Sequence, residues 1–196
     1  MILVYKISFE LNMGETIKDF FIRPHRQTYY SFDLGPNITF VANRKCIRDD
    51  FQILNLTDNK LVVSFYRFDD EQYENCLIYL HTHNGSKLEA VPMVESILSL
   101  GLNFCIFDFA GYGNSEGETV SLGCREIWDI ECIIEHLREH YHQYQFILWG
   151  RSMGAVAALL YLSTKCMMAA TKEKVEGMSA EVSVVAGIYD SPFYSL

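Results

Sequence analysis

The pattern of hydrophobic positions divides the chain into an aromatic N-terminal stretch and a region where strand and helix patterns alternate. Residues 1–45 show no clear period, but they contain too many aromatic side chains for a disordered tail. We predict an arm that packs on the domain. From Phe51 the pattern indicates a hairpin, with strands at 51–54 and 61–68 joined by a turn at 57–60.

Short, continuously apolar runs follow the hairpin, and each is separated from the next by a helical pattern. Such runs are typical of strands buried on both faces of a parallel sheet. The predicted strands cover residues 76–80, 103–108, 145–149 and 182–189, and the predicted helices run from the loop after Leu80 to about Leu100, over 125–140, and from Met153 to about Met168. Pro92 is awkward in the first helix unless that helix begins near it. Strands that alternate with helices predict an α/β domain with a mostly parallel sheet and helices on both faces.

Charge and cysteine content narrow the possible partners and the compartment. The formal net charge of -9 and the lack of a basic stripe argue against nucleic acid and anionic membranes as partners. Six widely spaced cysteines indicate reduced thiols. No run of apolar residues suggests a signal sequence or a membrane span. We therefore expect a cytoplasmic protein without a cofactor or a bound metal.

The sequence Gly150-Arg151-Ser152-Met153-Gly154 carries the clearest chemical signal. This Gly-x-Ser-x-Gly pattern lies between a predicted strand and a predicted helix, which is the setting of a nucleophile elbow. The glycines leave room where a side chain would collide with the neighbouring strand or helix. The helix that begins near Met153 directs free N–H groups towards the place where an oxyanion would form.

Four motifs in order resemble the serine-aminopeptidase-like branch of the α/β-hydrolase superfamily, which also contains lipase- and thioesterase-like serine hydrolases. The first, His81–Ser86 (His-Thr-His-Asn-Gly-Ser), resembles that branch's His-Gly-Asn-Ser-Gly-Ser oxyanion loop. The others are the Asp-x-x-Gly-x-Gly-x-Ser loop at 108–115, the elbow at 150–154, and Asp190-Ser191-Pro192-Phe193 after the sixth strand of the fold. The resemblance implies a serine hydrolase that cleaves an ester, thioester or peptide bond of a small-molecule or peptide acyl substrate.

The resemblance also implies roles for individual residues. Ser152 is the expected nucleophile, the backbone N–H of Met153 is the expected oxyanion donor, and the backbone N–H of His83 is the expected second donor. Thr82 replaces the glycine of the family's oxyanion loop. His81 is expected to hydrogen-bond within its own loop, and replacement of the catalytic base by the more exposed His83 is a less favoured interpretation.

The family's order of catalytic residues is Ser, Asp, His, but residues 153–196 contain one aspartate, Asp190, and no histidine. Asp190 matches the position after the sixth strand, so the role of the catalytic acid is not carried over to it. We therefore expect a fold that is incomplete after the sixth strand, with residues 1–45 as the arm and 46–196 as the N-terminal part of the hydrolase domain. Impaired activity is expected, and a non-catalytic binding protein on a partial hydrolase fold stays open as the alternative.

Two further groups of polar residues fit a less specific interpretation. His136-Leu137-Arg138-Glu139-His140 matches a zinc-protease pattern, but its polar residues lie off the apolar stripe of the helix, so we expect an outer surface. The acidic pairs at 49–50 and 69–70 are expected to be solvated loop charges.

The resemblance also implies the strand order 1-2-4-3-5-6-7-8. The predicted strand 182–189 would then lie at an edge although its sequence is that of a buried strand. Exposed apolar edges pair with other chains, so self-association through this strand is expected.

Overall fold

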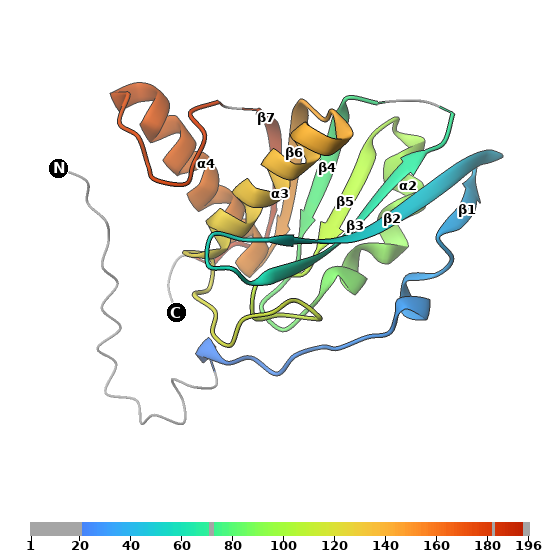
Figure 1. Cartoon of the computed structure of the whole chain (residues 1–196), viewed down its shortest axis with the longest axis horizontal. Helices are drawn as coiled ribbons and strands as arrows, with labels where there is room; N and C mark the ends of the chain where they lie inside the picture. The colour runs from blue at the N-terminus through green and yellow to red at the C-terminus, as the bar shows by residue number, and fades with distance from the viewer. Residues whose placement is uncertain (1–20, 71–72, 182, 194–196) are drawn as a thin grey trace.

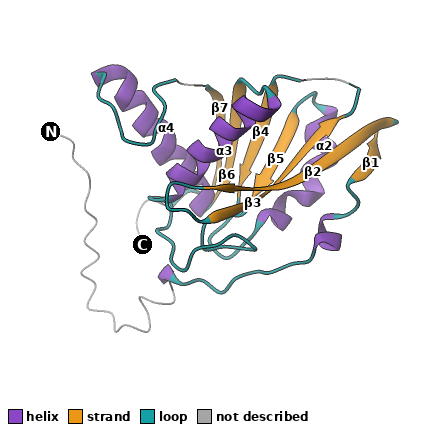
Figure 2. Ribbon diagram, viewed as in Figure 1, coloured by secondary structure: helices purple, strands orange, loops and turns teal. Residues whose placement is uncertain are grey.

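The computed structural model describes residues 21–70, 73–181 and 183–193. Seven strands form one twisted sheet in the order β1-β2-β3-β5-β4-β6-β7, with helices on both faces (Figures 1 and 2). The strands are β1 (Ile38–Val41), β2 (Arg44–Leu54), β3 (Lys60–Phe68), β4 (Asn75–Leu80), β5 (Asn103–Phe107), β6 (Gln145–Arg151) and β7 (Val184–Asp190). The helical elements are η1 (Ser31–Leu34), η2 (Lys87–Met93), α2 (Val94–Ser99), α3 (Glu126–Tyr141) and α4 (Met153–Thr171).

The sheet confirms the predicted fold class. From β2 onwards its order is that of strands 1-2-4-3-5-6 of the α/β-hydrolase fold, and β4, β5, β6 and β7 run parallel to their neighbours in this group. Helices α3 and α4 cover one face, and η2 and α2 cover the other, each over a separate apolar core. Pro92 lies in the 3₁₀ turn just before α2, which removes the difficulty that the sequence raised.

The hairpin is longer than predicted, because the first half of its first strand contains charged residues that interrupt the apolar strand pattern. β2 begins at Arg44, and part of the expected arm, Ile38–Val41, pairs with it as β1. Asp49 and Asp50 were expected in a loop, but they lie within β2 and are only about one-third exposed. Each is paired, Asp49 with Arg67 at 3.1 Å and Asp50 with Arg48 at 3.0 Å. The prediction that this acidic pair would be solvated in a loop was therefore wrong.

Strand β7 lies at the edge of the described sheet and is far more exposed than its sequence suggests. Val185 is 60 % exposed and Ile188 is 43 % exposed, although an apolar run of this kind predicts a strand covered on both faces. Its exposure and its position beside β6 agree with the edge place expected for it, although its sequence alone is that of a buried strand.

Helix α4 is long and apolar, whereas no run of this kind was expected from the sequence. By length and composition it could cross a membrane, and it is the one such helix in the described part of the chain. It packs on β6 and carries the buried Lys165, and core helices of this kind pass the same test.

Candidate active site

Ser152 occupies a strained turn between the end of β6 and the start of α4. Its backbone angles are φ 51° and ψ −113°, a conformation that costs a residue with a side chain of the order of 1–3 kcal/mol. The Ser152 N–H donates to the Asp190 carbonyl at 2.8 Å, and the Ser152 carbonyl accepts from Val156 N at 3.1 Å. These bonds tie the turn to the end of β7 and to the first turn of α4.

The two glycines of the pentapeptide are required by close backbone approach. A Cβ at Gly150 would lie 2.3 Å from the Gly154 carbonyl oxygen, and a Cβ at Gly154 would lie 2.0 Å from the carbonyl oxygen of Leu80. Leu80 is the last residue of β4, the strand that pairs with β6. The first turn of α4 therefore packs directly on the start of the loop that follows β4.

In that loop His81 is fully buried and both of its ring nitrogens are occupied. Its Nε2 accepts from Phe109 N at 3.1 Å, so its Nδ1 carries the proton and donates to the Thr82 carbonyl at 2.7 Å. This confirms that His81 hydrogen-bonds its own loop, and it links this loop to the one that follows β5.

His83 is half-buried and lies next to the elbow through a shared partner. The Tyr112 hydroxyl is 2.7 Å from His83 Nδ1 and 2.9 Å from the sulfur of Met153. The His83 Nε2 atom is buried and has no hydrogen-bond partner among the described residues. Burial is the main reason why the pKa of His83 lies below its usual value, opposed by the charge of Glu126 and reinforced by His81.

Thr82, the departure from the family's glycine, is anchored by Glu89. Its hydroxyl donates to Glu89 Oε1 at 2.5 Å, and its backbone N–H donates to Oε2 at 3.3 Å. The Tyr79 hydroxyl donates to the same Oε2 at 3.2 Å. The Thr82 side chain thus replaces the freedom of a glycine with a fixed contact to the first turn of η2.

Asp108 organises the glycine-rich loop from within the core. This fully buried carboxylate accepts from Lys87 N at 2.7 Å, from the Tyr29 hydroxyl at 2.6 Å and from Asn114 N at 3.0 Å. A Cβ at Gly113 would lie 2.3 Å from its carboxyl carbon. These contacts fix the shape of the loop.

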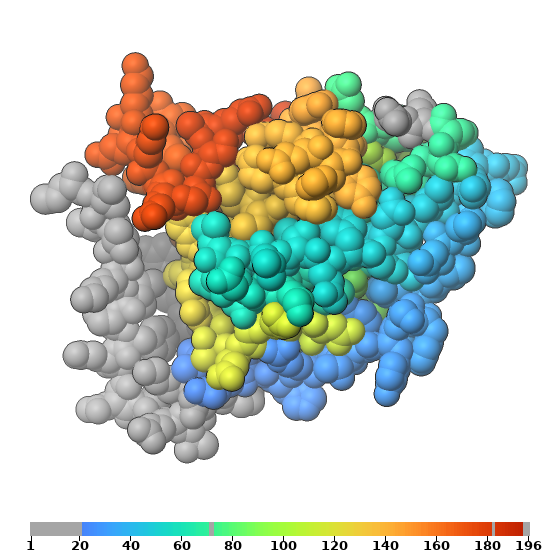
Figure 3. Space-filling view, viewed as in Figure 1, coloured from blue at the N-terminus to red at the C-terminus, as the bar shows by residue number. Residues whose placement is uncertain are grey.

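The described part of the N-terminal arm covers this loop. Arg26 donates to the carbonyls of Ser115 and Gly117, and Val120 N donates to the Ile22 carbonyl at 2.9 Å. Figure 3 shows the arm, in blue, lying along the yellow-green loop at the rim of the molecule. The arm therefore lies beside the edge of the sheet that carries Ser152.

The first histidine of the zinc-protease pattern, His136, packs on aromatic residues. The His136 ring stacks on Phe51 of β2 at 4.8 Å and lies 4.4 Å from the ring of His140. His136 is half-buried, so its expected place on an outer surface was wrong, whereas Glu139 and His140 are exposed as expected. Within the described residues no three His, Cys, Asp or Glu side chains are arranged to hold a metal ion.

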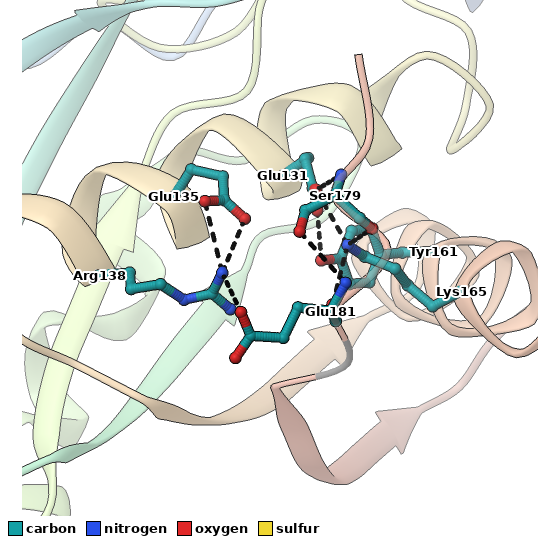
Figure 4. Close-up of polar contacts among 7 residues, drawn as sticks. All are labelled: Glu131, Glu135, Arg138, Tyr161, Lys165, Ser179 and Glu181. Atoms are coloured by element: carbon teal, nitrogen blue, oxygen red, sulfur yellow. Dashed lines mark hydrogen bonds and ion pairs between the residues drawn. The ribbon is translucent and has the colours of Figure 1, made fainter. Parts of the chain in front are cut away.

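A buried ion pair that was not predicted from the sequence joins α3 and α4 (Figure 4). Lys165 Nζ lies 2.9 Å from Glu131 Oε1, and the two side chains are 2 % and 3 % exposed. Glu131 also accepts from the Tyr161 hydroxyl at 2.6 Å and from Ser179 N at 2.6 Å, and Lys165 donates to the Ser179 carbonyl at 2.7 Å. Glu131 falls between Ile127 and Ile134 on the apolar stripe of α3, which was the available signal.

Comparison with known proteins agrees with this geometry. The family model for serine aminopeptidase S33 matches residues 73–178, which is more than half of the chain. The chain belongs to this family. The match includes the loops after β4 and β5 as well as the elbow.

Two curated proteins match part of the chain. The uncharacterized protein YqkD of Bacillus subtilis is 31% identical over 114 residues, which is 54% of this chain and 37% of YqkD. The uncharacterized membrane protein YNL320W of Saccharomyces cerevisiae is 37% identical over 67 residues, or 33% of this chain and 22% of that protein. The chain thus spans little more than a third of these relatives at most.

Solved structures show the same fold. The esterase Pf2001 of Pyrococcus furiosus superposes with a TM-score of 0.64 and 24% identity, over 88% of this chain and 57% of the esterase. The esterase EaEST of Exiguobacterium antarcticum gives a TM-score of 0.53 and 19% identity, over 71% of this chain and 44% of that chain. This family member therefore has the α/β-hydrolase fold, and esterases are among its structural neighbours.

Proposed function

We propose that this chain is a serine hydrolase in which Ser152 attacks an ester, thioester or amide carbonyl and becomes acylated. The observation that carries the proposal is the strained backbone of Ser152 between β6 and α4, with Gly150 and Gly154 in close backbone contact. Strain of this kind persists only where the surroundings enforce it, and it is typical of active sites. The nucleophile elbow is the known use of such a turn.

The backbone N–H of Met153 is the proposed principal oxyanion donor. Met153 is the first residue of α4, so its N–H belongs to the group at a helix start that has no partner within the helix. The positive end of the helix dipole favours the negative charge that develops on the carbonyl oxygen. The backbone N–H of His83 is proposed as the second donor, because its loop begins where Leu80 contacts Gly154.

A fluorophosphonate probe followed by peptide mass analysis tests the proposal. We expect the probe to label Ser152 in the folded chain, because labelling needs an activated serine. Ser191→Ala is the matched control, since Ser191 is an exposed serine with φ 54° at the same end of the neighbouring strand. Labelling should survive Ser191→Ala and disappear in Ser152→Ala.

The same experiment separates the hydrolase from a non-catalytic binding protein. A binding protein on this fold would keep the geometry of the turn but would not activate the Ser152 hydroxyl. The unaltered chain would then show no more labelling than Ser152→Ala at any probe concentration. That result would reject the hydrolase proposal.

A further inference from the structure

The contacts of Tyr112 determine which nitrogen of His83 carries the proton. A thioether sulfur can only accept a hydrogen bond, so the 2.9 Å contact between the Tyr112 hydroxyl and Met153 Sδ requires Tyr112 to donate. The hydroxyl has a single hydrogen. The 2.7 Å contact with His83 must therefore run the other way, with Nδ1–H of His83 donating to the Tyr112 oxygen.

This tautomer leaves the lone pair of neutral His83 on Nε2. That atom is buried and has no partner within the described part of the chain. A buried polar atom without a hydrogen bond costs about 1–3 kcal/mol, and native structures keep few of them. A triad histidine has the same arrangement, with Nδ1–H donating to an oxygen and Nε2 free to accept a proton.

The position of His83 relative to the elbow follows from three contacts. β4 and β6 are neighbours, with Leu80 opposite Gly150. The first turn of α4 packs on the carbonyls of Leu80 and His81, where a Cβ at Gly154 would lie 2.0 Å and 2.9 Å from the two oxygens. Met153, the residue after Ser152, touches the hydroxyl that holds the His83 ring.

We propose that the His83 imidazole, held by Tyr112, is the general base for Ser152. This inference rests on the proposed function. As Ser152 Oγ bonds to the acyl carbon, its proton passes to His83 Nε2, and His83 Nδ1–H keeps its hydrogen bond to Tyr112. When the bond to the leaving group breaks, Nε2 returns the proton to that group. Water repeats the two transfers to release the acid and restore Ser152.

Tyr112 is a positioning residue in this scheme, and a weak one compared with a carboxylate. Burial raises the pKa of its phenol far above neutral, so it faces the imidazolium as a neutral dipole. Glu126 is the charged group that favours protonated His83, while burial and His81 oppose protonation. His83 is therefore neutral at pH 7, and the proposed base is available but poorly stabilised once charged, so slow turnover is expected.

The test is the rate of fluorophosphonate labelling of Ser152 as a function of pH in the full 196-residue chain. His83 has a pKa lowered below its usual 6.5, so the rate should rise with pH through a midpoint below 6.5 and stay level from pH 7 to 9. His83→Asn should lower the plateau about 100-fold or more and remove the acid limb, as loss of a general base does. Tyr112→Phe should lower the plateau less and keep the acid limb.

Each outcome has a separate meaning. Labelling of His83→Asn at the rate and with the acid limb of the unaltered chain would overturn this inference and leave the proposed function intact. A midpoint above pH 7.5 in the unaltered chain would overturn it too, without any variant having to fold. Failure to label Ser152 at any pH would reject the proposed function itself. Recovery of labelling in His83→Ala on addition of imidazole would support the base.

Discussion

Helix α4 carries two polar clusters that differ in how completely their hydrogen bonds are satisfied. At its first turn lie the strained Ser152, the Met153–Tyr112–His83 contacts and an Nε2 atom without a described partner. Three turns further on, Lys165 and Glu131 are almost fully buried, and their oxygens and nitrogen are used by Tyr161, Ser179 and the segment up to Glu181.

The difference fits the proposal that the first cluster is arranged for chemistry, whereas the second holds the fold together. A satisfied network in a low-dielectric interior rigidifies the elements it joins, here α3, α4 and the segment before β7. An unsatisfied buried nitrogen and a strained serine each cost stability, and such costs are concentrated at functional sites. Substitutions of the polar side chains should therefore lower reactivity in the first cluster and the free energy of unfolding in the second.

The largest expected effect comes from adding a side chain at the close backbone contact between Gly154 and Leu80. In Gly154→Ala the new Cβ would lie 2.0 Å from the carbonyl oxygen of Leu80, which is backbone and cannot rotate away. We expect the elbow and the end of β4 to separate and the chain to lose more than about 4 kcal/mol of stability, a range reserved for such steric faults. Urea unfolding followed by tryptophan fluorescence measures the loss.

Gly187→Ala is the matched control for that steric argument. Its Cβ would also meet an atom at 2.1 Å, but this atom is the hydroxyl of Tyr189, the end of a side chain on the exposed edge strand. The side chain can move, so the cost should stay within about 1 kcal/mol, because alanine suits a strand better than glycine does. Equal losses in the two variants would contradict the steric account of the elbow.

The second effect tests the ion pair in the middle of α4. Glu131→Gln leaves Lys165 buried without a counter-charge, and breaking a buried pair in this way costs about 3–5 kcal/mol. The same urea titration should show this loss, while fluorophosphonate labelling of the remaining folded protein keeps its pH profile.

A double variant separates the lost charge pair from lost packing. Glu131→Leu with Lys165→Met replaces both ions by apolar side chains, and such replacements are often neutral or stabilising. Here Ser179 N and the Tyr161 hydroxyl would still lose their acceptor, so recovery should be partial. A double variant as unstable as Glu131→Gln would show that the network, rather than the unpaired charge, carries the energy.

The sequence predicted the sheet and the turn at Ser152 because both depend on local patterns. Continuous apolar runs marked β4, β5 and β6, and the glycines at 150 and 154 marked a turn whose close contacts the structure shows.

The first half of β2 was missed because its charges pair across strands, with Arg67 and Asp49 as one example, and a linear pattern cannot show partners. Lys165 and Glu131 were missed for the same reason, since each charge is tolerated only through the other. The tautomer of His83 depends on Tyr112 and Met153, which lie 29 and 70 positions away from it along the chain, so only the folded structure reveals it.

A smaller effect is expected from the Thr82 hydroxyl in the loop that follows β4. Thr82→Val removes the hydrogen bond to Glu89 but keeps the shape of the side chain, and Glu89 retains Thr82 N and the Tyr79 hydroxyl as donors. Loss of one such bond should cost about 1 kcal/mol. Labelling of Ser152 should change little. If Thr82→Val abolished labelling while the fold persisted, the loop would take part in the reaction more directly than we propose.

The smallest effect on folding stability is expected at the exposed edge, where the consequence should be a change in association. We propose that two copies associate through β7, because an apolar edge strand offers unpaired N–H and C=O groups beside exposed side chains such as Val185 and Ile188.

Val185→Lys places a charge on that edge, and an exposed substitution of this kind should alter stability by no more than about 0.5 kcal/mol. Sedimentation velocity should show a dimer or larger species for the unaltered chain and a shift to monomer for Val185→Lys. Leu100→Lys, at an apolar side chain that is 72 % exposed at the end of α2, is the matched control and should leave the association unchanged. If the unaltered chain sediments as a monomer at all concentrations, the proposal is contradicted, because the exposed strand then needs no partner copy.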